Sequence, residues 1–140
     1  MHRLTLLWFL LSGLFFVGLA ACGGGNESAS PTETELLAKA EHSLTAYLNK
    51  DWNTFLNSCA SESRTSRNID NLEEEHRRLL RGNKPEDVSL SGFAAVPNFP
   101  DGKSVLFDVY FSGRYVGQDR LPWKVENGQW VNTDCRGGHQ

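Results

Sequence analysis

The chain has 140 residues, of which 39% are hydrophobic and 22% are charged. This length and composition suit one small globular domain and exclude a multidomain enzyme. The formal net charge is −3, with 14 Lys and Arg against 17 Asp and Glu. Such a balance provides no basic surface for a nucleic-acid backbone or for anionic lipid headgroups.

The first 21 residues predict an export signal or a membrane anchor. Arg3 is the only formal charge before Glu27, and the segment 4–21 is uncharged. Eighteen uncharged residues are at the lower limit for crossing a bilayer core of about 30 Å, so length alone does not separate the two interpretations. The sequence Leu19-Ala20-Ala21-Cys22 resembles the lipobox of bacterial lipoproteins. The resemblance implies that Cys22 is lipidated on sulfur with diacylglycerol, whose acyl chains include palmitate, and becomes the new N-terminus. The alternative is an uncleaved anchor with an incidental cysteine.

Three segments follow from this interpretation. Residues 1–21 are the predicted lipoprotein signal peptide, residues 22–30 a lipidated flexible tether, and residues 31–140 the folded domain. The tether is glycine-rich, with small and polar residues, and cannot bury enough apolar surface to fold. Two acyl chains hold a protein at a bilayer far more firmly than one. We therefore expect a lipid-anchored protein on the extracytoplasmic side of the cell membrane. Gly23 rather than Asp follows Cys22, so the inner-membrane retention signal of Gram-negative lipoproteins is absent, and a Gram-positive or actinobacterial envelope fits equally.

The first half of the domain predicts three helices. Ser30 as N-cap, Pro31 at the first helical position and Glu33 start a helix that continues to about Asn49. Asp51 caps a shorter second helix that ends near Cys59. Asp70 starts a third, which ends at Gly82.

After Pro85 the hydrophobic pattern alternates, as in strands. One strand is expected at 88–96 and another around 105–111, joined at Asp101-Gly102. Asn127-Gly128 predicts a type I′ hairpin, which places Val125 opposite Trp130 on a face shared with Trp123. Gly117 and Pro122 predict a bulge or an edge position in the third strand.

Three helices before a curved antiparallel sheet of about four strands form an α+β domain, with the helices packed on one sheet face. The helix junction Tyr47-Leu48-Asn49-Lys50-Asp51-Trp52 and the closing hairpin 123–131 resemble the NTF2-like, or cystatin-like, cone fold. The whole chain is similar to small bacterial, notably actinobacterial, envelope lipoproteins with such a domain.

The remaining cysteines predict a disulfide. With Cys22 lipidated, Cys59 and Cys135 form an even pair in an exported chain. This bridge would attach the last strand to the helical layer. No zinc-type spacing links the Cys and His residues, so no metal and no cofactor are expected.

The cone-fold resemblance implies a pocket between helices and sheet, in which some family members, such as ketosteroid isomerases and dehydratases, place a catalytic carboxylate, tyrosine or histidine. The candidate pocket residues here are Tyr47, His76, Asp119, Trp123 and Trp130. Tyr47 is more simply explained as a core residue with its hydroxyl at the rim, His76 as a hydrogen-bonded histidine at the core boundary, and Asp119 as an exposed turn residue. No nucleophile elbow, zinc-protease helix or phosphate loop occurs. We expect a non-catalytic domain that binds an envelope protein partner or a small apolar ligand. The alternative is an isomerase-like or dehydratase-like enzyme with a pocket carboxylate.

Two further features of the sequence concern the surface of the domain. The charged stretch 64–84 mixes both signs and predicts a solvated helix face rather than a polyanion site. Phe93, Phe99, Tyr110 and Tyr115 are candidates for an exposed aromatic patch.

Overall fold

The computed structural model describes residues 30–65 and 69–135. The predicted signal peptide, Cys22 and the tether up to residue 29 lie outside the described residues. The helices are α1 (Glu33–Leu48), α2 (Trp52–Asn57), α3 (Ser61–Thr65) and α4 (Ile69–Leu80), followed by the short 3₁₀ helix η1 (Pro85–Asp87). The strands are β1 (Val88–Pro97), β2 (Lys103–Phe111), β3 (Arg114–Glu126) and β4 (Gln129–Asn132).

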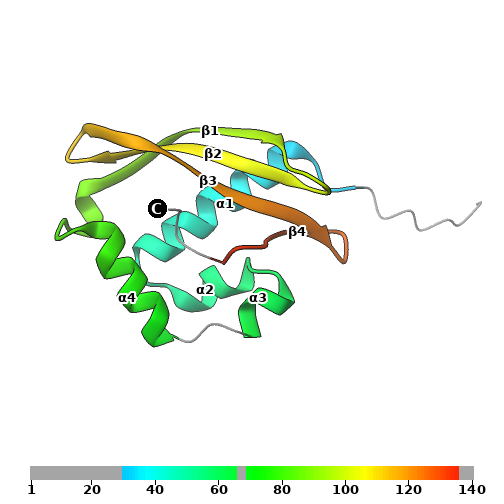
Figure 1. Cartoon of the computed structure of the whole chain (residues 1–140), viewed down its shortest axis with the longest axis horizontal. Helices are drawn as coiled ribbons and strands as arrows, with labels where there is room; N and C mark the ends of the chain where they lie inside the picture. The colour runs from blue at the N-terminus through cyan, green and yellow to red at the C-terminus, as the bar shows by residue number, and fades with distance from the viewer. Residues whose placement is uncertain (1–29, 66–68, 136–140) are drawn as a thin grey trace, which may run out of the picture.

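The predicted α+β architecture is confirmed. The strands form one antiparallel sheet in the order β1-β2-β3-β4, and the helices come before it in the chain. Figure 1 shows the sheet as one layer with α1 running beneath it and α2, α3 and α4 on the same side. The helical layer therefore covers one face of the sheet.

Helix α1 begins two residues later than the sequence predicts. Its N-cap is Thr32, not Ser30, and Glu35 completes a capping box with it. The Thr32 hydroxyl accepts the Glu35 amide at 3.2 Å, and the Glu35 carboxylate accepts the Thr32 amide at 2.6 Å. This reciprocal pair satisfies two backbone donors, which Ser30 with Glu33 does not do here. The helix ends where predicted, with Asn49 as C-cap.

The helical layer contains one more helix than the three predicted. Helix α3 carries no apolar residue, so it shows no hydrophobic period. Tertiary bonds hold it instead, because the Ser63 hydroxyl donates to the Thr133 carbonyl at 2.6 Å and Lys124 pairs with Glu62 at 2.8 Å. Asp51 caps α2 as predicted, accepting the Thr54 amide at 3.2 Å.

Helix α4 differs from its prediction by one residue. It begins at Ile69 rather than at Asp70, which lies in its first turn. Its predicted end is confirmed, since Leu80 is the last helical residue and Gly82 has φ of 85°.

A hydrophobic core fills the space between α1 and the sheet. Val105 and Phe107 are fully buried on β2. They pack with Leu121 and Trp123 of β3 and with a buried stripe of α1 that contains Leu36, Ala40 and Leu44. Trp130 belongs to this core, and its indole Nε1 donates to the Thr32 carbonyl at 2.9 Å. This bond ties the last strand to the start of α1.

The strand pairings follow the predicted turns. Asn127 and Gly128 both have positive φ, 52° and 74°, and Val125 lies opposite Trp130, so the predicted two-residue turn is confirmed. A register shift next to Gly117 confirms the predicted bulge. Pro122 continues the strand, and its carbonyl accepts the Thr133 amide at 3.0 Å.

Candidate functional site

A groove opens between the second half of α1 and the first strand of the sheet. Its volume is about 200 Å³. The walls come from α1 and the turn after it, from η1 and from β1. The lining residues are Glu41, Thr45, Leu48, Asn49, Pro85, Val88, Leu90 and Phe93.

The floor of this groove is apolar and supported by the core. Phe93 stacks on Phe107 with ring centroids 5.8 Å apart and an interplanar angle of 21°. Such aromatic pairs contribute about 0.5–1.5 kcal/mol beyond the area that they bury. Leu90 also packs against the main core. Glu41 and Thr45 are exposed on the α1 side, so the groove combines an apolar floor with a polar rim.

The amino-acid sequence did not predict this groove. Of its lining residues, only Phe93 was a candidate, as part of an aromatic patch. The four residues do not form one patch. Phe93 stacks on the buried Phe107, and Phe99 lies in the loop before β2, at the opposite end of that strand from Tyr110 and its neighbour Tyr115. The signal available in the sequence was the uncharged strand 88–97.

The structure brings together two of the predicted pocket residues, Tyr47 and His76. Both are buried, and their ring centroids are 5.5 Å apart. They belong to an aromatic cluster of α1, α2 and α4 with Trp52 and Phe55. His76 Nε2 bonds the Leu48 carbonyl at 3.0 Å, and because a carbonyl only accepts, Nε2 carries the proton. The bond attaches α4 to the C-terminal end of α1, which is a structural role.

The other predicted pocket residues lie along the sheet. Trp123 and Trp130 belong to the core between α1 and the sheet. Asp119 lies opposite Phe107 and shares a face with Trp123, as the alternation predicts. It is half-buried rather than fully exposed, and its carboxylate accepts the Arg120 amide at 2.7 Å.

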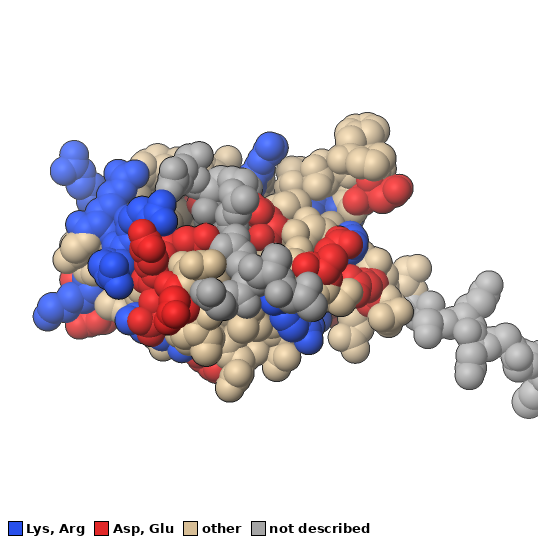
Figure 2. Space-filling view, turned by 60° about the horizontal axis from the view of Figure 1, so that its bottom comes forward, with Lys and Arg blue, Asp and Glu red and all other residues tan. Residues whose placement is uncertain are grey.

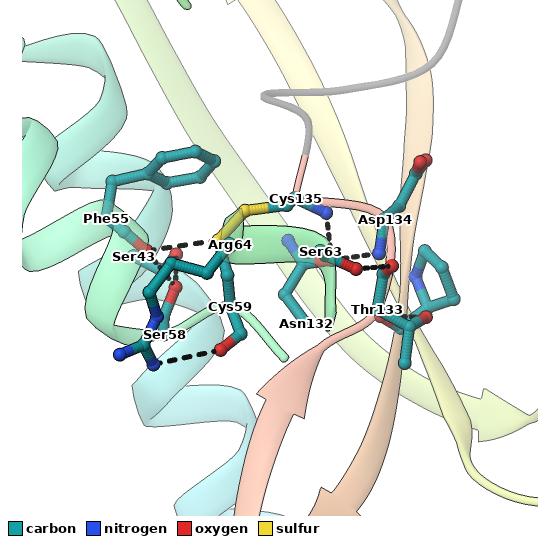
Figure 3. Close-up of a disulfide and its surroundings, with 11 residues drawn as sticks. Ser43, Phe55, Ser58, Cys59, Ser63, Arg64, Asn132, Thr133, Asp134 and Cys135 are labelled. Atoms are coloured by element: carbon teal, nitrogen blue, oxygen red, sulfur yellow. Dashed lines mark hydrogen bonds between the residues drawn. A yellow bond between two sulfur atoms is a disulfide. The ribbon is translucent and has the colours of Figure 1, made fainter. Parts of the chain in front are cut away.

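The predicted disulfide is present between Cys59 and Cys135. The Cα atoms are 5.3 Å apart, and the bridge spans 76 residues. Figure 3 shows it between the end of α2 and the segment after β4, surrounded by hydrogen bonds. The Ser58 hydroxyl donates to the Phe55 carbonyl at 2.6 Å, so Ser43 is the donor in the 2.6 Å bond between the two serines.

Asn132 also stabilises the chain next to the disulfide, and the sequence did not predict this role. It is fully buried, and its side-chain oxygen accepts the amides of Asp134 and Cys135 at 2.9 and 3.0 Å. Cys135 has φ of 52°, a left-handed conformation that costs an L-residue about 1–2 kcal/mol. The Asn132 bonds hold the chain in this turn and so position the cysteine for the disulfide.

The charged side chains are mixed in sign, as predicted for the 64–84 stretch. Figure 2 shows Lys and Arg gathered at the end of the molecule that carries α4, with Asp and Glu beside them. Arg78 and Glu74 form an i,i+4 pair at 3.3 Å in which both side chains are 61% exposed. Exposed pairs of this kind contribute little to stability, which fits a solvated helix face.

Near α3, hydrogen bonds shift the pKa values of two side chains. The Ser61 hydroxyl donates to Glu126 at 2.6 Å and lowers the pKa of that carboxyl, with Lys124 acting in the same direction. The bond from Lys124 to Glu62 raises the pKa of Lys124. These groups connect α3 to β3.

The chain matches no protein-family model, and a search of curated proteins found none similar to it. Within residues 30–65 and 69–135, no three His, Cys, Asp or Glu side chains are placed to hold a metal ion. No helix of this part is long and apolar enough to cross a membrane. The function must therefore be inferred from the groove and from the side chains described above.

Proposed function

We propose that this chain is a bacterial lipoprotein, anchored through Cys22 on the extracytoplasmic side of the cell membrane, whose domain binds a partner. The lipobox-like sequence before Cys22 supports the anchor. The Cys59–Cys135 disulfide supports export, because such bonds persist in oxidising compartments.

We also propose that the domain is an NTF2-like cone. Two observations support this proposal. The helices precede the sheet in the chain, as the resemblance implies, and α1 lies across the inner face of the sheet. Helix α3 is an addition to that pattern.

The observation that carries the binding function is the groove beside β1. It offers an apolar floor of Leu90 and Phe93 next to the exposed Glu41 and Thr45, the combination that binding sites for proteins and apolar ligands share. Tyr47 and His76, by contrast, are explained by packing and by one backbone bond.

A photo-crosslinking amino acid at Thr45 in living cells tests the binding function. The matched control is Thr34, an exposed threonine of the same helix, about 16 Å away at 1.5 Å per residue. We expect discrete crosslinked products in the envelope fraction from position 45 only. Identical patterns from both positions would contradict a binding groove.

One observation favours the enzymatic alternative, namely that Asp119 lies on the helix-facing side of β3 in line with Leu121 and Trp123. The substitution Asp119→Asn separates the two functions. The binding function predicts that crosslinking at Thr45 is unchanged. An enzyme would lose turnover of a small apolar substrate while the domain stays folded.

A further inference from the structure

The two edges of the sheet differ in how they are covered. The β4 edge is closed by the segment before α3, since Asn132 donates to the Ser58 carbonyl and accepts the Ala60 amide, both at 2.8 Å. On the β1 edge, no strand of the described residues pairs. Strand β1 has ten residues and no charge among them, whereas natural edge strands are commonly protected by lysines or other charged residues.

The ladder shows which backbone groups point to this open edge. The Ser112 amide donates to the Asp87 carbonyl at 2.7 Å, so these two residues occupy a hydrogen-bonded position of the ladder. The second bond of that position is replaced, because the Asp87 amide donates to the Lys84 carbonyl at 3.0 Å. Bonded and non-bonded pairs alternate in an antiparallel ladder, so Ser89 bonds to β2 while Leu90 directs its N–H and carbonyl to the open edge. The Val88 amide already donates to Pro85. Leu90 therefore presents a donor and an acceptor side by side, and its side chain lines the groove.

We propose that an extended segment of a partner protein adds to β1 as a further strand and places its apolar side chains in the groove. This inference rests on the proposed binding function and names the partner class. Residues opposite each other in a pair of strands direct their side chains to the same face. The residue opposite Leu90 thus directs its side chain into the space between α1 and β1, next to Phe93.

The size and charge of the groove select this occupant. Pockets that enclose drug-sized ligands measure about 300–1,000 Å³, whereas this groove measures about 200 Å³, which suits one or two side chains. Glu41 is the only charged residue among those that line it. The partner segment therefore alternates apolar and polar residues and carries a Lys or Arg that faces Glu41.

A second copy of the chain fits this edge poorly. In a continuous sheet built from two copies, the inward side chains of the second β1 pack against their own α1, as Leu90 and Phe93 do against the core here. Those side chains are not available to fill the groove of the first copy. An extended segment without its own covering helix has no such restriction.

The test selects random linear twelve-residue peptides displayed on phage against the protein purified from membranes in detergent. We expect enriched sequences with alternating apolar residues and a basic residue. Synthetic copies methylated at alternate backbone nitrogens should bind at least about ten-fold more weakly by fluorescence anisotropy, because they cannot donate to the Leu90 carbonyl. Thr45→Trp, which fills the groove, should weaken binding by a similar factor, and the matched Thr34→Trp should not. Glu41→Gln should weaken the peptides that carry a basic residue.

Several outcomes would overturn the inference. These are no enrichment of peptides, binding that is insensitive to backbone methylation, or equal loss of binding in both tryptophan variants. Protein dimers in which the Leu90 amide is protected from hydrogen exchange would assign the edge to a second copy instead. Crosslinking at Thr45 without any peptide selection would leave the binding function in place and remove strand addition. The methylated peptides test the inference even if a tryptophan variant fails to fold.

Discussion

Removing the Cys59–Cys135 disulfide should cost this domain a large part of its stability. The bridge closes a loop with a sequence separation of 76 residues, and the chain-entropy relation then gives about 4.5 kcal/mol at 25 °C. Domains of this size are stable by only about 5–15 kcal/mol. The substitution of both cysteines by alanine should therefore leave a marginally stable fold.

The assay is equilibrium unfolding in guanidinium chloride, with tryptophan fluorescence as the signal. The alanine variant and reduced wild type are measured under non-oxidising conditions. Oxidised protein is the reference. Reduced wild type keeps both sulfur atoms, so its difference from the alanine variant isolates the packing of the buried side chains, which are 0% exposed. A loss below about 1 kcal/mol on reduction would refute the chain-entropy account of what the bridge contributes to stability. Finding both thiols free in protein isolated from the envelope would refute the bridge itself.

Three further predictions test the lipid anchor, the turn that ends at Cys135, and the dependence of stability on acidic pH. Cys22→Ala should abolish labelling with palmitate analogues and release the protein from membranes, and persistent labelling in the variant would show that the lipobox interpretation is wrong. Asn132→Ala should destabilise the domain by about 2–4 kcal/mol in denaturant titrations, because the buried Cys135 amide and the partly buried Asp134 amide lose their acceptor. The exposed control Asn53→Ala should change stability by no more than about 0.5 kcal/mol. The Ser61 bond lowers the pKa of Glu126 from the ordinary value of 4.5, so this carboxylate stabilises the fold above that pH and its contribution is lost as the pH falls through the lowered pKa. The thermal midpoint of Glu126→Gln should therefore fall less steeply than that of wild type below pH 4.5, and parallel pH profiles would contradict this role.

Local chemistry explains which parts of the fold were predictable. The Asn127-Gly128 turn needs positive φ at both residues, a requirement that only a few residue types meet, so the sequence identifies the hairpin and its register. The disulfide could be predicted by counting the cysteines of a chain that the sequence predicts to be exported. The predicted start of α1 was wrong because Ser30 and Thr32 are both suitable N-cap residues. The structure selects Thr32, since the Glu35 side chain accepts its backbone amide.

The unpredicted parts depend on contacts between distant segments. Helix α3 has no apolar period and is held by Thr133 and Lys124, about 70 and 62 residues further along the chain. Asn132 is important only because the chain turns back at Cys135. The groove exists because α1 crosses next to β1 and leaves that edge open, and no single segment of the sequence encodes this crossing.

The most direct test of the proposed lipid-anchored, exported domain is the intact mass of the protein isolated from native membranes. The account predicts a chain that begins at Cys22, carries a diacylglycerol group, and is two hydrogen atoms lighter than the reduced form because Cys59 and Cys135 are joined. A mass that includes residues 1–21, or a chain without lipid, would contradict it.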